Sequence, residues 1–136
     1  MRTTVTFEGN LADHPQTRFT PAGKQITELT VLVNQRRQNE VGEWVDGEPT
    51  RLVVRSFKTL AENIVESLVK GDRVFVHGTV TTEAWTDKQS GEKRTAQRVL
   101  AEVVGPSLRW ATARIAKTTR VSASGEDPQN VGEHEA

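Results

Sequence analysis

The 136-residue chain contains no cysteine, which excludes disulfides, thiolate nucleophiles and cysteine-ligated zinc or iron–sulfur sites. It has no apolar run approaching the roughly 20 residues of a membrane-spanning helix, and residues 1–20 lack the apolar core of a secretory signal. We therefore expect a cytoplasmic protein. Because 35% of the residues are hydrophobic, the chain can form one modest core, and a single domain is expected.

Residue patterns that perform catalysis are also scarce. The three histidines, His14, His77 and His134, lie in a predicted loop, a strand and the tail, without the spacing of metal ligands. The chain has no glycine-rich phosphate loop, no Walker lysine and no nucleophile elbow. We expect no active site, no metal site and no cofactor.

The zero net charge hides an asymmetry along the chain. Residues 1–121 hold 18 basic and 14 acidic residues, a net charge of +4, whereas residues 122–136 hold four acids and no Lys or Arg. A basic body with an acidic tail favours a polyanionic partner with which the tail competes, although such tails also serve as solubilising ends.

Most of the body alternates with the period of a β-strand. The predicted strands are residues 2–11, 24–37, 50–57, 73–86 and 93–104. In the second strand, Leu29, Val31 and Val33 share one face. Gly, Asp and Pro residues mark 38–49 as an exposed loop, which carries Trp44.

One segment has helical periodicity instead. Apolar residues recur at a spacing of three to four between Leu60 and Leu68, with Thr59 as a possible cap and Lys70-Gly71 as a stop. The order is therefore three strands, one short helix and two strands. It predicts an all-β fold, the five-stranded OB-fold barrel with a helix between strands 3 and 4, although a sandwich or an SH3-like barrel also fits the strand count. We assign residues 1–118 to this domain and residues 119–136 to a disordered acidic tail.

The third predicted strand has the composition of a nucleic-acid-binding surface. Alternation from residue 50 places Arg51, Arg55 and Phe57 on the face opposite Leu52 and Val54. In the fourth strand the same alternation puts five side chains on one face: Arg73, Phe75, His77, Glu83 and Trp85. Arginine pairs with phosphate and aromatic rings stack on any base, so this combination favours an unpaired strand over a duplex.

Several short stretches agree, in type and order, with one known family. They are Gly9-Asn10-Leu11, Asp13-His14-Pro15, Leu60–Asn63, Leu68–Gly71, Val74–Gly78, Gly91–Thr95 and Gly105–Ala113. Over roughly residues 4–117 the chain resembles the bacterial single-stranded DNA-binding protein family, and the Gly105–Arg109 block is similar to its actinobacterial branch.

The resemblance implies a non-enzymatic homotetramer that binds single-stranded DNA without sequence preference during replication, recombination and repair. It implies that Phe57 and Trp85 stack on bases, and that Arg37 and Arg51 replace tryptophans found in many members. In the actinobacterial branch the segment after Pro106 clasps a neighbouring subunit, which implies interface roles for three residues: Leu108, Trp110 and Ile115. The family's acidic tail usually ends in a short hydrophobic tip, whereas this chain ends Val131–Ala136 without one. We therefore expect a specialised paralogue that does not recruit other DNA-processing proteins through its tail.

The expected function is sequence-independent binding of single-stranded DNA by a cytoplasmic, nucleoid-associated protein. The predicted DNA-binding residues are Arg18, Arg36, Arg37, Trp44, Arg51, Arg55, Phe57, Lys58, Trp85, Lys93 and Arg94. Two alternatives remain at this point. One is an RNA-binding or chaperone barrel, and the other is a protein-interaction module that docks an acidic partner on its basic face.

Overall fold

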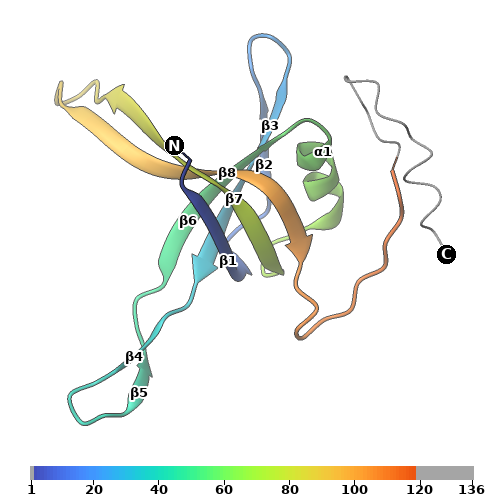
Figure 1. The fold of residues 1–136 in the computed structure, drawn as a ribbon. Coiled ribbons are helices and arrows are strands. Elements are labelled where there is room, and N and C mark those ends of the chain that lie inside the picture. The colour runs from blue at the N-terminus through green and yellow to red at the C-terminus, as the bar shows by residue number, and fades with distance from the viewer. Residues whose placement is uncertain (1, 119–136) are drawn as a thin grey trace.

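The computed structural model describes residues 2–118 of the chain. Its elements are β1 (Thr4–Leu11), β2 (Gln16–Phe19), β3 (Gln25–Val33), β4 (Arg36–Gln38), β5 (Trp44–Asp46), β6 (Thr50–Phe57), α1 (Lys58–Ser67), β7 (Arg73–Thr86) and β8 (Lys93–Pro106) (Figure 1). Within residues 2–118, no helix is long and apolar enough to cross a membrane.

Five of the strands close into a barrel. The sheet order is β1-β7-β8-β6-β3-β2, and a further pairing of β1 with β3, at Asn10↔Leu32 and Leu11↔Val31, completes the circle. The helix α1 separates the third barrel strand, β6, from the fourth, β7. The predicted all-β architecture with one helix between strands 3 and 4 is confirmed.

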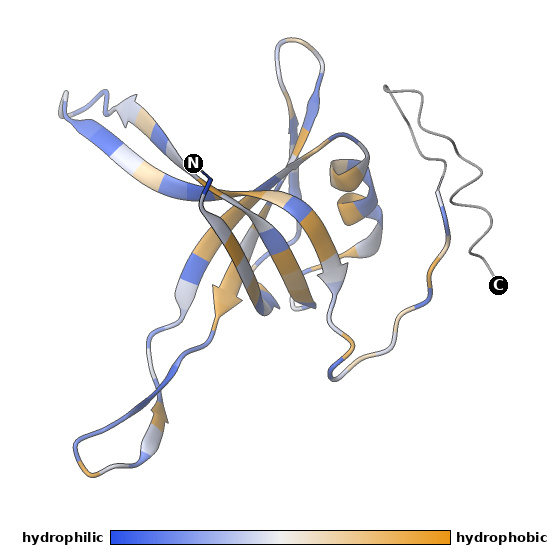
Figure 2. Cartoon of the chain, viewed as in Figure 1, coloured by the Kyte–Doolittle hydropathy of each residue, from blue (hydrophilic) through white to orange (hydrophobic). Residues whose placement is uncertain are grey.

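The barrel interior holds the core, and the predicted alternation explains which side chains enter it. Leu29 and Val31 of β3, Val54 of β6, and Val74 and Val76 of β7 are all buried. The apolar residues gather on the barrel strands and α1, while the projecting hairpins are mainly hydrophilic (Figure 2).

The helix begins and ends earlier than the sequence predicted. Phe57 is its N-cap and makes no side-chain capping hydrogen bond, so the assignment of Thr59 as the cap is wrong. β6 runs directly into α1 through Lys58, whose φ of 59° lies in the left-handed region, and Thr59 is already helical. The helix stops at Ser67 with Leu68 as its C-cap, and the predicted stop, Gly71, lies three residues beyond that C-cap.

Two buried hydroxyl groups attach α1 to the sheet. Ser56 Oγ donates to the Thr27 carbonyl oxygen at 2.9 Å, which joins β6 to β3. Thr27 Oγ1 in turn donates to the Ala61 carbonyl oxygen of α1 at 3.2 Å. Because each buried hydroxyl has a partner, neither carries the cost of an unsatisfied polar group.

Close backbone approaches at two glycines allow the barrel to close. A Cβ added at Gly9 would lie 2.4 Å from the Leu32 carbonyl oxygen, where β1 crosses to β3. A Cβ at Gly78 would lie 2.3 Å from the Leu100 carbonyl oxygen, beside the β-bulge between β7 and β8. The first strand therefore needs a glycine at position 9, and it continues past that residue to Leu11.

The second predicted strand is divided in the structure. β3 ends at Val33, and the following residues form a separate two-stranded sheet in which β4 pairs with β5. The Gln35 carbonyl oxygen accepts a hydrogen bond from the Gly47 amide at 2.6 Å, which closes the base of this hairpin. The segment predicted as a loop is therefore partly strand, and the short β2 was not predicted. The predicted tail, residues 119–136, lies outside the described residues.

Candidate nucleic-acid interface

The outward-pointing side chains of β2, β3 and β6 continue onto a hairpin that leaves the barrel. This hairpin is the β7–β8 arm, residues 82–97, which projects beyond the barrel in Figure 1. We call the outer side of β2, β3 and β6, together with the same side of the β7–β8 arm, the candidate face. It contains six of the predicted DNA-binding residues: Arg18, Arg51, Arg55, Phe57, Trp85 and Arg94. Lys58 borders the face as the first residue of α1.

Phe57 lies at one end of the candidate face, where β6 meets α1. Its side chain is on the side of β6 opposite the buried Ser56, and 38% of the residue is exposed. Ile26 of β3 pairs with Phe57 of β6 on one side and with Arg18 of β2 on the other. Arg18 therefore lies in the same row as Phe57, two strands away. An exposed ring between cations is an arrangement that accepts a stacked base with its phosphate.

Trp85 occupies the β7–β8 arm and is 45% exposed. It faces Arg94 across the two strands of the arm. Arg94 Nε lies 3.2 Å from Asp87 Oδ2, which orients the guanidinium at the arm tip. The hydrogen bond from the Gln89 amide, aided by Ser90 and Arg94, holds the pKa of Asp87 below its ordinary value, so this carboxylate is ionised at neutral pH.

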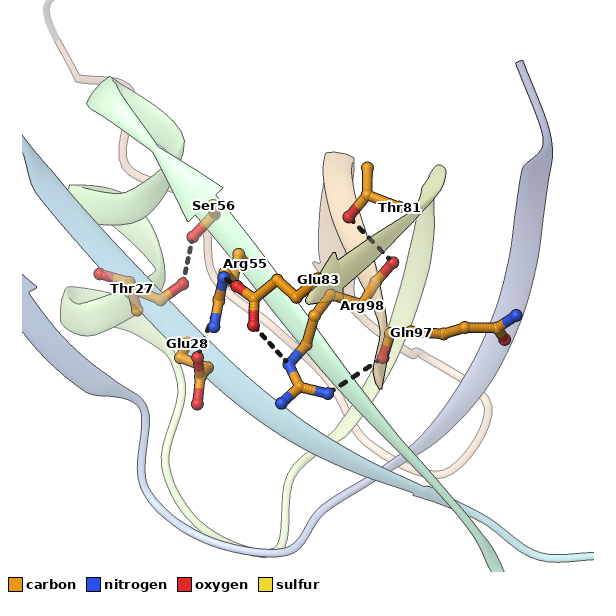
Figure 3. Close-up of polar contacts among 8 residues, drawn as sticks. All are labelled: Thr27, Glu28, Arg55, Ser56, Thr81, Glu83, Gln97 and Arg98. Carbon is orange, nitrogen blue, oxygen red and sulfur yellow. Dashed lines mark hydrogen bonds and ion pairs between the residues drawn. The ribbon is translucent and has the colours of Figure 1, made fainter. Parts of the chain in front are cut away.

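Between these two aromatic residues lies a cluster of four charged side chains, shown in Figure 3. Arg55 donates from Nε to Glu28 Oε2 at 3.0 Å, and its Nη1 contacts Glu83 Oε2. Arg98 Nε lies 3.8 Å from the second oxygen of Glu83. We name Glu28, Arg55, Glu83 and Arg98 the ion-pair cluster. Its net charge is zero, and each side chain is only 21–36% exposed.

Several predicted cations carry an unmatched charge. Within residues 2–118, those that form no ion pair are Arg18, Arg37, Arg51, Lys58 and Lys93. Arg55, in contrast, is matched by two carboxylates. The candidate face therefore has positive regions on both sides of a neutral centre.

The β4–β5 hairpin, which projects away from the barrel, carries Arg36, Arg37 and Trp44 (Figure 1). Lys93 pairs with Thr86 on the arm, on the side opposite Trp85 and Arg94. Strand alternation puts Arg36 and Trp44 on one side of the hairpin and Arg37 on the other. Arg36 Nη2 donates to the Trp44 carbonyl oxygen at 3.5 Å and its Nε lies 3.9 Å from Asp46. The hairpin can contact a strand that leaves the candidate face, but it is not part of that face.

The first half of β7 faces different neighbours from the second half. Because this 14-residue strand wraps around the barrel, Arg73 and His77 point toward β1, far along the strand from Trp85. Thr6 Oγ1 lies 2.7 Å from His77 Nδ1, and Arg73 Nε donates to Glu8 Oε2 at 2.5 Å. The grouping of these residues on one face in sequence therefore does not bring them together in space.

Glu8 of β1, which contacts Arg73 in the first half of β7, also contacts the segment that follows β8. The Ser107 hydroxyl donates to Glu8 Oε2 at 2.6 Å, and this hydrogen bond, followed by that from Arg73, lowers the pKa of Glu8. The ring of Trp110 lies against two guanidinium groups, with centroid distances of 4.8 Å to Arg73 and 4.6 Å to Arg109.

Residues 107–118 form neither a helix nor a strand, and they run beside the barrel (Figure 1). Leu108, Trp110 and Ile115 are all strongly exposed, Ile115 to 89%. An open groove of about 1130 Å³ separates this segment from α1 and the end of the barrel. Three large, strongly exposed apolar side chains on one segment are typical of a surface that another molecule covers.

No group of three metal-ligating side chains is assembled anywhere in the described range, residues 2–118. The chemistry that the candidate face offers is stacking on exposed rings and ion pairing with phosphate.

Comparison with known proteins identifies the family. Residues 2–107 match the sequence model of the single-strand binding protein family. The chain belongs to this family. Membership makes it a single-stranded DNA-binding protein with the OB-fold and without enzymatic activity.

Individual relatives agree along most of the chain. It is 39% identical to the single-stranded DNA-binding protein of Mycobacterium tuberculosis over 142 aligned positions, which cover 93% of this chain and 86% of the relative. It is 41% identical to that of Mycolicibacterium smegmatis, covering 87% and 72%. The resemblance to actinobacterial members is therefore confirmed at the level of the family.

Solved structures confirm the fold. The small single-stranded DNA-binding protein of Streptomyces coelicolor superimposes with a TM-score of 0.65 at 25% identity, covering 79% of this chain and 96% of that one. A deletion mutant of the single-stranded DNA-binding protein of Thermus aquaticus gives 0.67 at 29% identity, covering 79% and 50%.

Sequence reasoning missed the ion-pair cluster. The alternation of β3 does place Glu28 on its outer face, and Glu83 was noted beside Trp85. The pairing of Glu28 with Arg55, however, depends on the register between β3 and β6, and the contact with Glu83 depends on how the arm crosses β6. No local sequence signal contains either fact.

Proposed function

We propose that this protein binds single-stranded DNA along the candidate face, with bases stacked on Phe57 and Trp85. The observation that carries the proposal is the exposure of both rings beside cations on the outer wall of the barrel, in a chain of the single-strand binding family. Stacking accepts every base, so binding on this face is independent of sequence.

The phosphate backbone is held by the unmatched cations. Arg18 and Lys58 lie at the Phe57 end of the face, Arg51 lies at the start of β6, and Lys93 lies on the arm, on the side opposite Trp85. Guanidinium groups pair with phosphate and also stack on bases, so Arg51 can occupy a position where other members have an aromatic ring. The β4–β5 hairpin, with Arg36, Arg37 and Trp44, extends the path for longer strands.

The working form that we propose is a homotetramer. Leu108, Trp110 and Ile115 supply an exposed apolar strip outside the barrel, and burying it against a neighbouring subunit removes that strip from water. Sedimentation of the protein and of Ile115→Glu tests this assignment. We expect the wild type to sediment as a tetramer and the variant as a smaller species, whereas a wild-type monomer would contradict the proposal.

The cellular role that follows is protection of exposed single strands during replication, recombination and repair, in the cytoplasm at the nucleoid. Specialisation as a paralogue, with no recruitment of partners through the tail, stays a prediction because residues 119–136 lie outside the described residues. A pulldown with the last ten residues that recovers replication or repair enzymes would argue against it.

The proposed function is tested by titrating the protein with oligo(dT) of increasing length, with oligo(rU) and duplex DNA of matched length as competitors. We expect tight binding of oligo(dT) that weakens as salt rises, and poor competition by the duplex. Preferential binding of RNA would favour the RNA-binding alternative, since that requires recognition of the 2′-hydroxyl. Absence of binding to any nucleic acid would favour the protein-interaction module.

A further inference from the structure

The ion-pair cluster lies where a DNA strand would pass between the two aromatic side chains. β8 runs parallel to β6 at Val54↔Val99 and antiparallel to β7, so β6 and β7 run in opposite directions here. Phe57 follows Arg55 by two residues on β6, and Trp85 follows Glu83 by two residues on β7. Phe57 and Trp85 therefore lie on opposite sides of the Arg55–Glu83 contact, each about 6.6 Å from it along its own strand.

The carboxylates occupy the sites on these arginines that a phosphate would use. A carboxylate and a phosphate present the same pair of oxygens to a guanidinium group. Arg55 faces Glu28 across paired strands and Glu83 across the base of the arm, while Arg98 faces Glu83. The carboxylates are attached to the fold beside the arginines and repel an incoming phosphate, so they compete with it effectively.

We propose that Glu28 and Glu83 keep Arg55 and Arg98 from contacting phosphate, and so divide the DNA path into two separate binding stations. One station is Phe57 with Arg18 and Lys58, and the other is Trp85 with the half-exposed Arg94 that faces it across the arm. Between them a strand crosses a neutral surface and is held by stacking at its two ends. This inference rests on the proposed function and specifies which residues set the number of phosphate contacts.

Arg98 is the more informative of the two arginines. Its Nε is buried without a hydrogen-bond partner within residues 2–118, and its carboxylate neighbour is Glu83. Neutralising Glu83 leaves Arg55 paired with Glu28 but leaves Arg98 with no carboxylate in that range. The Glu83→Gln variant therefore adds one cation to the centre of the face while retaining the size of the side chain.

The test measures oligo(dT) affinity by fluorescence anisotropy over a salt series from about 0.05 to 0.5 M NaCl. For Glu83→Gln we expect the slope of log affinity against log salt to be steeper than that of the wild type by about 0.7. Each tenfold drop in salt should therefore tighten binding by the variant about fivefold more than it tightens binding by the wild type. The double variant with Arg98→Gln should return to the wild-type slope. Glu62→Gln, which removes the same charge from the exposed side of α1, is the matched control and should leave the slope unchanged.

An unchanged slope in Glu83→Gln overturns the inference. Weaker binding with a flatter slope overturns it too, and would instead make Glu83 a residue that positions the arm for binding. Thermal unfolding of each variant verifies that it folds. If Glu83→Gln does not fold, Glu28→Gln removes a charge from the same cluster and is expected to steepen the slope in the same direction. Failure of the wild type to bind oligo(dT) contradicts the proposed function, whereas wild-type binding with unchanged variant slopes contradicts this inference alone.

Discussion

Replacement of Trp85 by alanine should weaken DNA binding without unfolding the protein. A tryptophan exposes about 250 Å² at most, so 45% exposure leaves roughly 110 Å² accessible on the arm. At about 25 cal/mol per Å², complete coverage of that area by a base contributes at most about 2.8 kcal/mol. Single-strand-binding barrels of this family lose about 1–3 kcal/mol per stacked base on such truncation, a range carried over from those proteins. The upper bound of about 2.8 kcal/mol for the exposed area of Trp85 lies within this range.

This loss corresponds to a rise in Kd of about 5- to 150-fold for oligo(dT) at fixed salt, measured by fluorescence anisotropy. The control is Trp85→Phe, which keeps an aromatic face and should retain most of the affinity. Because Trp85 lies on the arm and outside the core, its removal should change the free energy of unfolding by less than about 0.5 kcal/mol. A change in Kd below twofold, in a variant that melts like the wild type, would refute the stacking role of Trp85.

Three further predictions address phosphate contacts, the core and pH. Arg51→Ala should flatten the salt dependence of oligo(dT) binding by about 0.7 in log–log slope, and an unaltered slope would give Arg51 a structural role. Leu29→Ala should lower the free energy of unfolding by about 2–5 kcal/mol in a urea titration, because Leu29 is buried in the barrel; a loss under about 1 kcal/mol would contradict that placement. The pKa of Glu8 is lowered by Ser107 and Arg73, so its contribution to stability is present above the ordinary value of 4.5 and is lost as pH falls below it. Thermal melts across this range should show a weaker pH dependence in Glu8→Gln, and curves that parallel the wild type would exclude the effect.

Much of the barrel could be predicted because its strands carry their own signal. Alternation in β3, β6 and β7 shows directly which side chains enter the core, and Leu29 and Val76 lie where that pattern places them. β2 and the β4–β5 hairpin were harder to predict, because their residues are mostly exposed and polar and show no clear apolar period. These elements are held by hydrogen bonds to neighbouring strands, and the residue pattern within each short segment does not show which strand it will pair with.

The candidate site was predictable in its residue types and less so in its layout. Phe57 and Trp85 are exposed on the outer side of their strands, as alternation indicates. The division of β7 into one half near Glu8 and another half near Arg55 follows from the curvature of a long strand, which a two-residue period does not encode.

The most direct measurement uses a variant in which Trp44 and Trp110 are replaced by phenylalanine, so that Trp85 is the single fluorescent tryptophan. Titration with oligo(dT) should quench its emission to a saturating level, and added salt should restore the emission as the DNA dissociates. Binding of oligo(dT), detected by anisotropy, with no change in Trp85 emission would show that the strand does not pass over the candidate face.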